Sequence, residues 1–228
     1  MKPITSPDVI ESTTLQLGFL PYFRGRIPGF SIEEHTPPNL WFAPDSDGPW
    51  EWKGLVIRRG NVVYAKLFER KAVYASMPCY CRLANIRRAA CSLSPDERSV
   101  LNAISANESL LTTDIRSICG FNAMSDVDFL LSDDKSASPR RKSLDSILSR
   151  LQAACQIVVA DFEYKVDKHG RPYGWGVARY VTPESLYPDS FALPDESPDA
   201  SLDELLARLS SLFPLTDSHT LRRLLTKI

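Results

Sequence analysis

Two groups of residues in the N-terminal quarter carry side chains that could do chemistry. Glu34 is followed by His35, and Glu51 lies between Trp50 and Trp52. A pocket for a nucleobase extruded from DNA needs aromatic faces for stacking and an acid or an oriented water for the glycosidic bond. Glu51 and Glu34 are therefore the candidate catalytic residues.

A strand-like run farther along contributes to the same candidate pocket. The pocket residues are His35, Trp50, Trp52, Tyr64 and Lys66. A lysine amine such as that of Lys66 can attack an aldehyde to form an imine. A structural interpretation stays open beside this one. If residues 50–52 form a strand, alternation of period two puts both tryptophans in the core and points Glu51 to solvent.

The five cysteines form no regular framework, and an odd count is typical of free thiols in a reducing compartment. Cys79 and Cys81 form a C-x-C pair, but the scattered histidines supply no second close pair for a zinc site. We therefore expect no metal and no cofactor, and we interpret Cys79 and Cys81 as alternating residues of a strand.

No apolar run approaches the roughly 20 residues that span a bilayer. The first 18 residues lack the basic start and apolar centre of a secretory signal. We expect a cytoplasmic protein without membrane contact.

Charge is unevenly distributed along a chain whose formal net charge is −1. Residues 51–90 hold nine Lys and Arg against two acids, and residues 140–180 hold eight against four. The remaining segments are acidic. Two basic blocks in an acidic chain are typical of a polyanion-binding face, although basic and acidic segments can also neutralise each other across internal contacts.

The pattern of residues predicts an α+β fold in three regions. Residues 1–90 form a loop-rich and β-meander region, residues 91–187 a winged-helix domain, and residues 188–228 an acidic linker with a helical pair. In the first region, residues 18–52 are expected to be an irregular surface segment. Residues 55–57, 62–68 and 72–76 are predicted strands, separated by turn signals at 59–61 and 69–71.

The middle region has the order of elements of a winged helix. A capping box at residues 94–97 opens one helix, and a second runs from residue 113 to 119, before Gly120. A third helix has a single apolar stripe, and its other face is polar and includes Ser149 and Gln152. Residues 156–164 and 175–181 are predicted strands of a hairpin whose basic loop spans residues 165–173.

In a winged helix the third helix enters the major groove and the wing contacts the backbone. The second basic block falls on these two elements, so we expect it to bind duplex DNA. Its predicted DNA-binding residues are Arg140, Arg141, Lys142, Arg150, Gln152, Lys165, Lys168 and Arg171. Winged helices also serve as protein-interaction modules, and that alternative stays open.

The C-terminal region is acidic and helical. A capping box at residues 201–204 is expected to open one helix, which Pro214 ends, and three leucines mark a last helix. Such a pair normally packs on the main body or on a partner.

Four stretches together resemble a known family: residues 18–23, 28–31, 49–54 and 173–180. They are similar to a group of bacterial proteins described as AlkZ-related, across residues 18–187. That group is distantly similar to the AlkZ/YcaQ winged-helix DNA glycosylases, which excise alkylated or crosslinked purines. The resemblance implies a winged helix and a role in DNA repair.

One departure separates this chain from the glycosylases, which resemble one another in a Gln-x-Gln or Gln-x-Asp catalytic motif. The glutamines here are Gln16, Gln152 and Gln156, and no two are separated by a single residue. Glycosylase activity is therefore not carried over. The leading interpretation is a DNA-binding winged-helix protein that recognises damaged DNA; the alternatives are an AlkZ-like glycosylase and a protein-interaction module.

Overall fold

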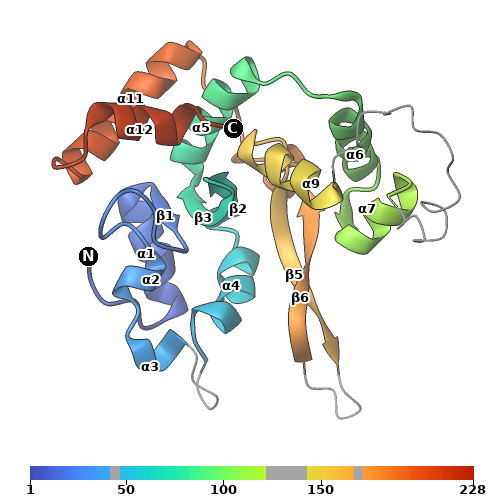
Figure 1. Cartoon of the computed structure of the whole chain (residues 1–228), viewed down its shortest axis with the longest axis horizontal. Coiled ribbons are helices and arrows are strands. Elements are labelled where there is room, and N and C mark those ends of the chain that lie inside the picture. Colours follow the sequence, from blue (N-terminus) through green and yellow to red (C-terminus); the bar gives the residue numbers. More distant parts are fainter. Residues whose placement is uncertain (42–46, 122–142, 167–171) are drawn as a thin grey trace, which may run out of the picture.

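The computed structural model describes residues 1–41, 47–121, 143–166 and 172–228. Two three-stranded antiparallel sheets are surrounded by helices, which confirms the α+β class (Figure 1). The helices are α1 (Pro7–Leu17), α2 (Ile32–His35), α3 (Pro38–Trp41), α4 (Pro49–Arg58), α5 (Met77–Ala90), α6 (Pro95–Ala106), α7 (Thr112–Ile118), α9 (Leu144–Ala153), α10 (Pro183–Leu186), α11 (Pro198–Leu212) and α12 (Ser218–Thr226). The strands are β1 (Phe19–Pro21), β2 (Val62–Phe68), β3 (Lys71–Ser76), β4 (Ser109–Leu111), β5 (Val158–Val166) and β6 (Pro172–Val181).

The first sheet has the order β1-β3-β2 and contains the predicted hairpin of β2 and β3. Glu69 and Arg70 at its turn have φ values of 50° and 60°, as a two-residue hairpin turn requires. β1 pairs with the other edge of β3. Its residues Phe19 and Leu20 are fully buried, so part of the segment expected at the surface belongs to the core.

The predicted strand at residues 55–57 is wrong, because these residues lie in helix α4. Pro49 occupies the first helical turn, and the carboxylate of Glu51 accepts the N–H of Gly48 at 2.9 Å. Both features stabilise a helix start. A short apolar run has no periodicity of its own that distinguishes helix from strand, and here the start signal upstream decides.

The strand expected around Cys79 and Cys81 is wrong for a similar reason. Both residues lie in α5, where Pro78 occupies the first turn, and both are buried. The five cysteines are free, as predicted. Cys155 is fully buried, whereas Cys119 is partly exposed.

The second sheet has the order β4-β6-β5, and α6, α7 and α9 lie where the sequence predicts them. Ser94 and Glu97 form the predicted capping box at the start of α6. The short strand β4 between α6 and α7 was not predicted, and it pairs with β6. β5 begins and ends two residues later than predicted, and β6 begins three residues earlier, because both ends of the predicted loop belong to the strands.

Helix α9 is buried on more sides than its pattern predicts. Its apolar stripe is buried, as expected. Ser149 and Gln152, expected on an exposed polar face, are only 8% and 1% exposed, so that expectation is wrong. The physical reason is strand β2: Gln152 Oε1 accepts the backbone N–H of Lys66 at 3.0 Å, where the register of β2 with β3 shifts. The side-chain amide of Gln152 thus supplies the hydrogen-bond acceptor that the backbone of β3 does not provide at this register shift.

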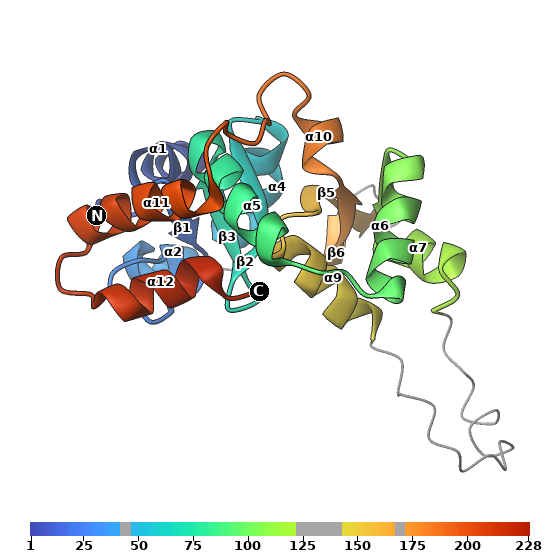
Figure 2. The same cartoon turned by 90° about the horizontal axis from the view of Figure 1, so that it is seen from above.

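Helix α11 begins four residues before the predicted capping box. Ser197 caps it, and Ser201 is fully buried within the helix, where its hydroxyl lies 2.7 Å from Glu196 Oε1 and 3.0 Å from Asn85 Nδ2. α12 follows as predicted. The two helices lie side by side and pack against α5 (Figure 2).

Two hydrophobic clusters form the interior, and each joins distant parts of the chain. One contains Val63 of the first sheet, Cys155 after α9, and Leu205 and Leu221 of the C-terminal helices. The other joins Tyr74 and Trp52 to α6, α9 and β5. Residues 1–90, 91–187 and 188–228 therefore share interior packing.

The guanidinium of Arg87 ties these parts together. It is fully buried and donates to the carbonyls of Leu67 (2.6 Å), Ala153 (2.8 Å), Leu224 (2.8 Å) and Leu225 (2.7 Å). These carbonyls belong to β2 and to the C-terminal ends of α9 and α12, where the helix dipole is negative. Burial lowers the pKa of Arg87, and the four carbonyls compensate for its lost hydration.

Arg87→Ala should lower the free energy of unfolding by about 2–6 kcal/mol. The carbonyls of Leu67 and Ala153 would lose a buried partner, at roughly 1–3 kcal/mol each. The measurement is urea denaturation followed by circular dichroism. Arg222→Ala, at an exposed position of α12, is the matched control and should change stability by no more than about 0.5 kcal/mol. Equal stability of both variants would contradict the role assigned to Arg87.

Candidate functional site

One face of α4 packs against strand β5 and carries most of the candidate site. Residues at intervals of three and four share this face: Trp50, Lys53, Gly54 and Arg58. Gly54 lies close to β5: a Cβ added there would lie 3.5 Å from Asp161 Oδ1, an ordinary van der Waals contact. Arg58 donates to Asp161 at 2.9 Å and fixes the helix to the strand.

Aromatic rings gather at the N-terminal end of this face. The ring centroid of Tyr22 lies 5.1 Å from that of Trp50 and 6.5 Å from that of Tyr74. Tyr64 lies 4.9 Å from Tyr74 and 5.8 Å from Phe162 of β5. We call this group the aromatic site; its rings are Tyr22, Phe23, Trp41, Trp50, Tyr64, Tyr74 and Phe162.

Lys53 lies against the rings of the aromatic site and is 7% exposed. Its Nζ lies 4.0 Å from the ring centroid of Phe162 and 5.2 Å from that of Trp50, within the range of cation–π attraction. Burial lowers the pKa of Lys53, although the negative charge of Glu51 opposes this shift. A larger fraction of this amine is therefore neutral near pH 7 than for an exposed lysine.

The hydroxyls of Tyr22 and Tyr74 are buried and have no hydrogen-bond partner among the described residues. Burial raises the pKa of both, and neighbouring Tyr64 adds to the shift, so both stay neutral donors. Because buried polar groups are normally paired, two such hydroxyls in one cluster indicate a place for a polar ligand or a water.

Glu51 lies at the edge of the aromatic site with an exposed side chain. One of its oxygens is engaged by the Gly48 N–H at the start of α4. Burial raises the pKa of Tyr22 and Tyr164, and the negative charge of Glu51 adds to both shifts, whereas at Lys53 it opposes the lowering of the pKa by burial. The acid therefore acts electrostatically on the amine and on two phenols.

The β5–β6 hairpin supplies the remaining wall. A Cβ added at Gly176 of β6 would lie 2.8 Å from Cζ of Tyr164 and 3.0 Å from Cβ of Phe162. The glycine therefore leaves room for the Tyr164 ring to lie across β6.

Glu34 and His35 lie apart from the aromatic site, in the short helix α2. Glu34 accepts the hydroxyl of Ser31 at 2.6 Å and the N–H of Gly29 at 3.0 Å, and it pairs with Arg24 at 3.4 Å. Burial raises the pKa of Glu34, but these partners outweigh it and leave the pKa below the ordinary value. His35 Nε2 lies 3.0 Å from the Gly29 carbonyl. Both side chains hold the turn, and a carboxyl of low pKa is a poor general acid.

Trp52 and Lys66 also fall outside the aromatic site. Two residues along a helix turn the side chain by about 200°, so Trp52 points away from Trp50. Lys66 Nζ lies 3.4 Å from Ser149 Oγ of α9. The structure thus brings Trp50, Tyr64 and Glu51 together but not the other predicted pocket residues. It adds Tyr22, Lys53, Tyr74, Phe162 and Tyr164, which the sequence analysis missed.

Most of the predicted DNA-binding residues lie outside the described residues: Arg140, Arg141, Lys142, Lys168 and Arg171. Lys165 pairs with Tyr173 in the β5–β6 ladder. Gln152 is buried against β2. Arg150 pairs with Glu97 at 3.5 Å and donates to Cys91 Sγ at 3.2 Å, so it supports the packing of α9 on α6.

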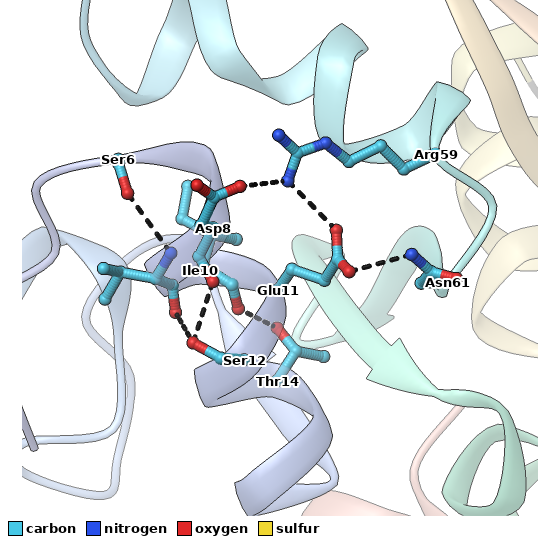
Figure 3. Close-up of polar contacts among 9 residues, drawn as sticks. Ser6, Asp8, Ile10, Glu11, Ser12, Thr14, Arg59 and Asn61 are labelled. Carbon is cyan, nitrogen blue, oxygen red and sulfur yellow. Dashed lines mark hydrogen bonds and ion pairs between the residues drawn. The ribbon is translucent and has the colours of Figure 1, made fainter.

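Four of the nine cations in the first basic block, residues 51–90, form ion pairs within the fold. Arg59 donates to Asp8 at 2.6 Å and to Glu11 at 3.2 Å, and Asn61 donates to Glu11 at 2.8 Å (Figure 3). Three further arginines form ion pairs: Arg58 with Asp161, Arg82 with Glu196 and Arg88 with Glu184. For this block the structure favours mutual neutralisation over a free cationic face.

The chain matches the family model described as AlkZ related over residues 4–226, and it belongs to this family. The predicted resemblance is thereby confirmed. Membership of this family suggests a function related to DNA repair. No match was found among curated proteins or among solved structures.

None of the helices in the described ranges has the length and apolar character needed to span a bilayer. Over the same ranges, no group of three or more His, Cys, Asp or Glu side chains is arranged to hold a metal ion.

Lys53 should titrate below the ordinary lysine pKa of about 10.4. The folded state then releases its proton while the unfolded state still holds it, so the stability of the protein relative to Lys53→Met should rise as pH approaches 10.4. NMR of 13Cε-labelled lysine can follow this titration, and the shifted signal should be absent in Lys53→Met. Lysine signals that all titrate together in the parent protein would contradict the burial of Lys53.

Proposed function

We propose that this protein binds duplex DNA through a winged-helix unit and recognises damaged DNA. The observation that carries the proposal is the order α6-β4-α7-α9-β5-β6 among the described residues, with the sheet order β4-β6-β5. In this described part, three helices with a short strand after the first, followed by a hairpin, are the elements of a winged helix. In Figure 1 the β5–β6 hairpin runs beside α4, and its far end points away from α9.

Membership of the AlkZ-related family supports a DNA partner. The second basic block, residues 140–180, also supports a DNA partner. Residues 140–142 directly precede α9, and Lys168 and Arg171 lie between β5 and β6 in the sequence. The first basic block supports no such role, since most of its described cations have partners inside the fold.

The burial of α9 restricts how such a unit can contact DNA. A recognition helix that lies along the major groove needs a free polar face. In α9 the side chains of Ser149 and Gln152 are covered, and Asp145 is exposed. We therefore propose contacts from the segment before α9 and from the hairpin, mainly to phosphates, with low sequence specificity.

Binding to a random-sequence duplex should weaken steeply with salt. With about four to six phosphates neutralised, the log–log slope is expected near −4 to −5. The triple variant Arg141→Gln, Lys142→Gln and Arg171→Gln should bind more weakly and make the slope shallower by about 2–3. Fluorescence anisotropy over a salt series measures both.

The matched control changes net charge equally on α12 and its C-cap residue: Arg222→Gln, Arg223→Gln and Lys227→Gln. It should keep the parent affinity and slope. If both triple variants bind alike, or if the parent binds no duplex, the proposed DNA surface is wrong. A folded chain without DNA binding would favour the protein-interaction alternative.

A second candidate function is base excision, and the aromatic site is the observation that favours it. Stacking rings beside Glu51 are what an extruded base requires. We nevertheless propose a binder, because the chain lacks the paired-amide motif of the glycosylases it resembles and one Glu51 oxygen is engaged in capping α4.

Purified protein should bind alkylated duplex DNA and release no base from it, and Glu51→Gln should change the affinity little. Liquid chromatography of the released bases, with binding measured in parallel, checks both statements. Excision by the parent that disappears in Glu51→Gln, while binding persists, would establish the second function instead. Glu34→Gln serves as the matched carboxylate control, since Glu34 lies outside the aromatic site.

A further inference from the structure

We propose that Lys53 Nζ forms an imine with the C1′ aldehyde of an abasic site in DNA, held in the aromatic site between α4 and β5. This inference rests on the proposed DNA binding and goes beyond it, because it names the lesion and the reacting atom. The amine of Lys53, which the sequence analysis did not consider, takes the role considered there for Lys66.

The surroundings of Lys53 distinguish it from the other described lysines of the first basic block. Lys66 and Lys71 donate hydrogen bonds to Ser149 and to the Arg24 carbonyl. Lys53 instead contacts the faces of Phe162 and Trp50. Ring faces hold a cation without taking the lone pair of the neutral amine, so the nitrogen can still attack a carbonyl carbon.

The position of Lys53 also limits what the aromatic site can bind. A cationic alkylated base would have to approach the same ring faces that already attract the Lys53 ammonium. Like charges at this separation repel each other, which disfavours such a ligand. A neutral aldehyde meets no such repulsion.

An abasic sugar suits the site for a further reason: it has no base to unstack, so its extrusion costs less free energy than base flipping. The unpartnered hydroxyls of Tyr22 and Tyr74 offer donors for a polar ligand. Phe162 on the hairpin contacts the Lys53 ammonium, which places the proposed wing and the amine at one site.

The reaction balances without a further reactant. The ring-opened abasic sugar presents an aldehyde, and the neutral Nζ attacks C1′ to give a carbinolamine. The C1′–O bond then breaks and the oxygen leaves as water, carrying both protons that the nitrogen gives up. The C1′=N double bond remains. Burial in the aromatic site favours the neutral amine that the first step needs.

Borohydride reduction of the imine tests the proposal in the full-length protein. A duplex with a single abasic site should yield a covalent complex, and peptide mass spectrometry should place the adduct on Lys53. Lys53→Met should lower the yield at least about tenfold, because the nucleophile is removed. Lys66→Met is the matched lysine control and should keep the parent yield. A duplex with tetrahydrofuran in place of the abasic sugar should give no adduct.

The mapping of the parent adduct keeps the test valid even if Lys53→Met fails to fold. An adduct on another lysine or on the N-terminal amine would overturn the proposal, as would no trapping by a protein that binds the abasic duplex.

A small aldehyde separates this inference from DNA binding. With 2-deoxyribose 5-phosphate and borohydride, Lys53 should be modified faster than the exposed lysines. Selective modification of Lys53 in a protein that binds no duplex would refute the proposed function but would still support a reactive Lys53 amine. Modification of the exposed lysines in preference to Lys53 would refute the proposed reactivity of the Lys53 amine.

Discussion

The burial of one guanidinium constrains how the chain packs. Arg87 lies at 0% exposure and must replace its lost hydration with hydrogen bonds, and the acceptors come from β2, α9 and α12. Carbonyls at two helix C-termini suit this cation, because each carries partial negative charge that no intrahelical N–H satisfies. Arg88 extends the arrangement by donating to the Cys155 carbonyl and to Glu184. The end of α9 is thereby held against both the first sheet and the C-terminal helices.

This packing has a consequence for function. With the C-terminal end of α9 beside β2, the Gln152 amide accepts a backbone hydrogen bond where the register of that strand shifts. The side chains of Ser149 and Gln152 on α9 are therefore buried and are not available to a DNA groove. The β5–β6 hairpin lies against α4, and its far end points away from α9 (Figure 1). The same elements that define a winged helix thus favour contact through the hairpin and through the helix start.

Sequence patterns predicted the elements that carry their own signals. α6 has a capping box, α9 an apolar stripe, and the β2–β3 hairpin two strand-like runs joined by a short turn. The candidate site was harder to predict, because residues 55–57 were interpreted as a strand and residues 50–52 as part of an irregular segment, with a strand as the alternative. With a helix starting at Pro49, Trp50 and Lys53 share a face and Trp52 leaves it. Contacts with residues 162 and 164 depend on long-range packing, which no local pattern encodes.

The aromatic site and the interior packing depend on each other. Its rings come from β2, β3, α3, α4, β5 and the segment that follows β1, so the site is assembled only when the hairpin lies against α4. Gly176 leaves room for the Tyr164 ring across β6, and the Arg58–Asp161 pair joins α4 to β5. This contact buries Lys53, whose ammonium group lies against ring faces and, within the described ranges, not against a carboxylate. Ring faces compensate for the lost hydration of a charge less well than an ion pair does. The fold retains this unfavourable burial where the Lys53 amine lies among aromatic rings, and a perturbed pKa of that kind is more typical of a functional site than of a core.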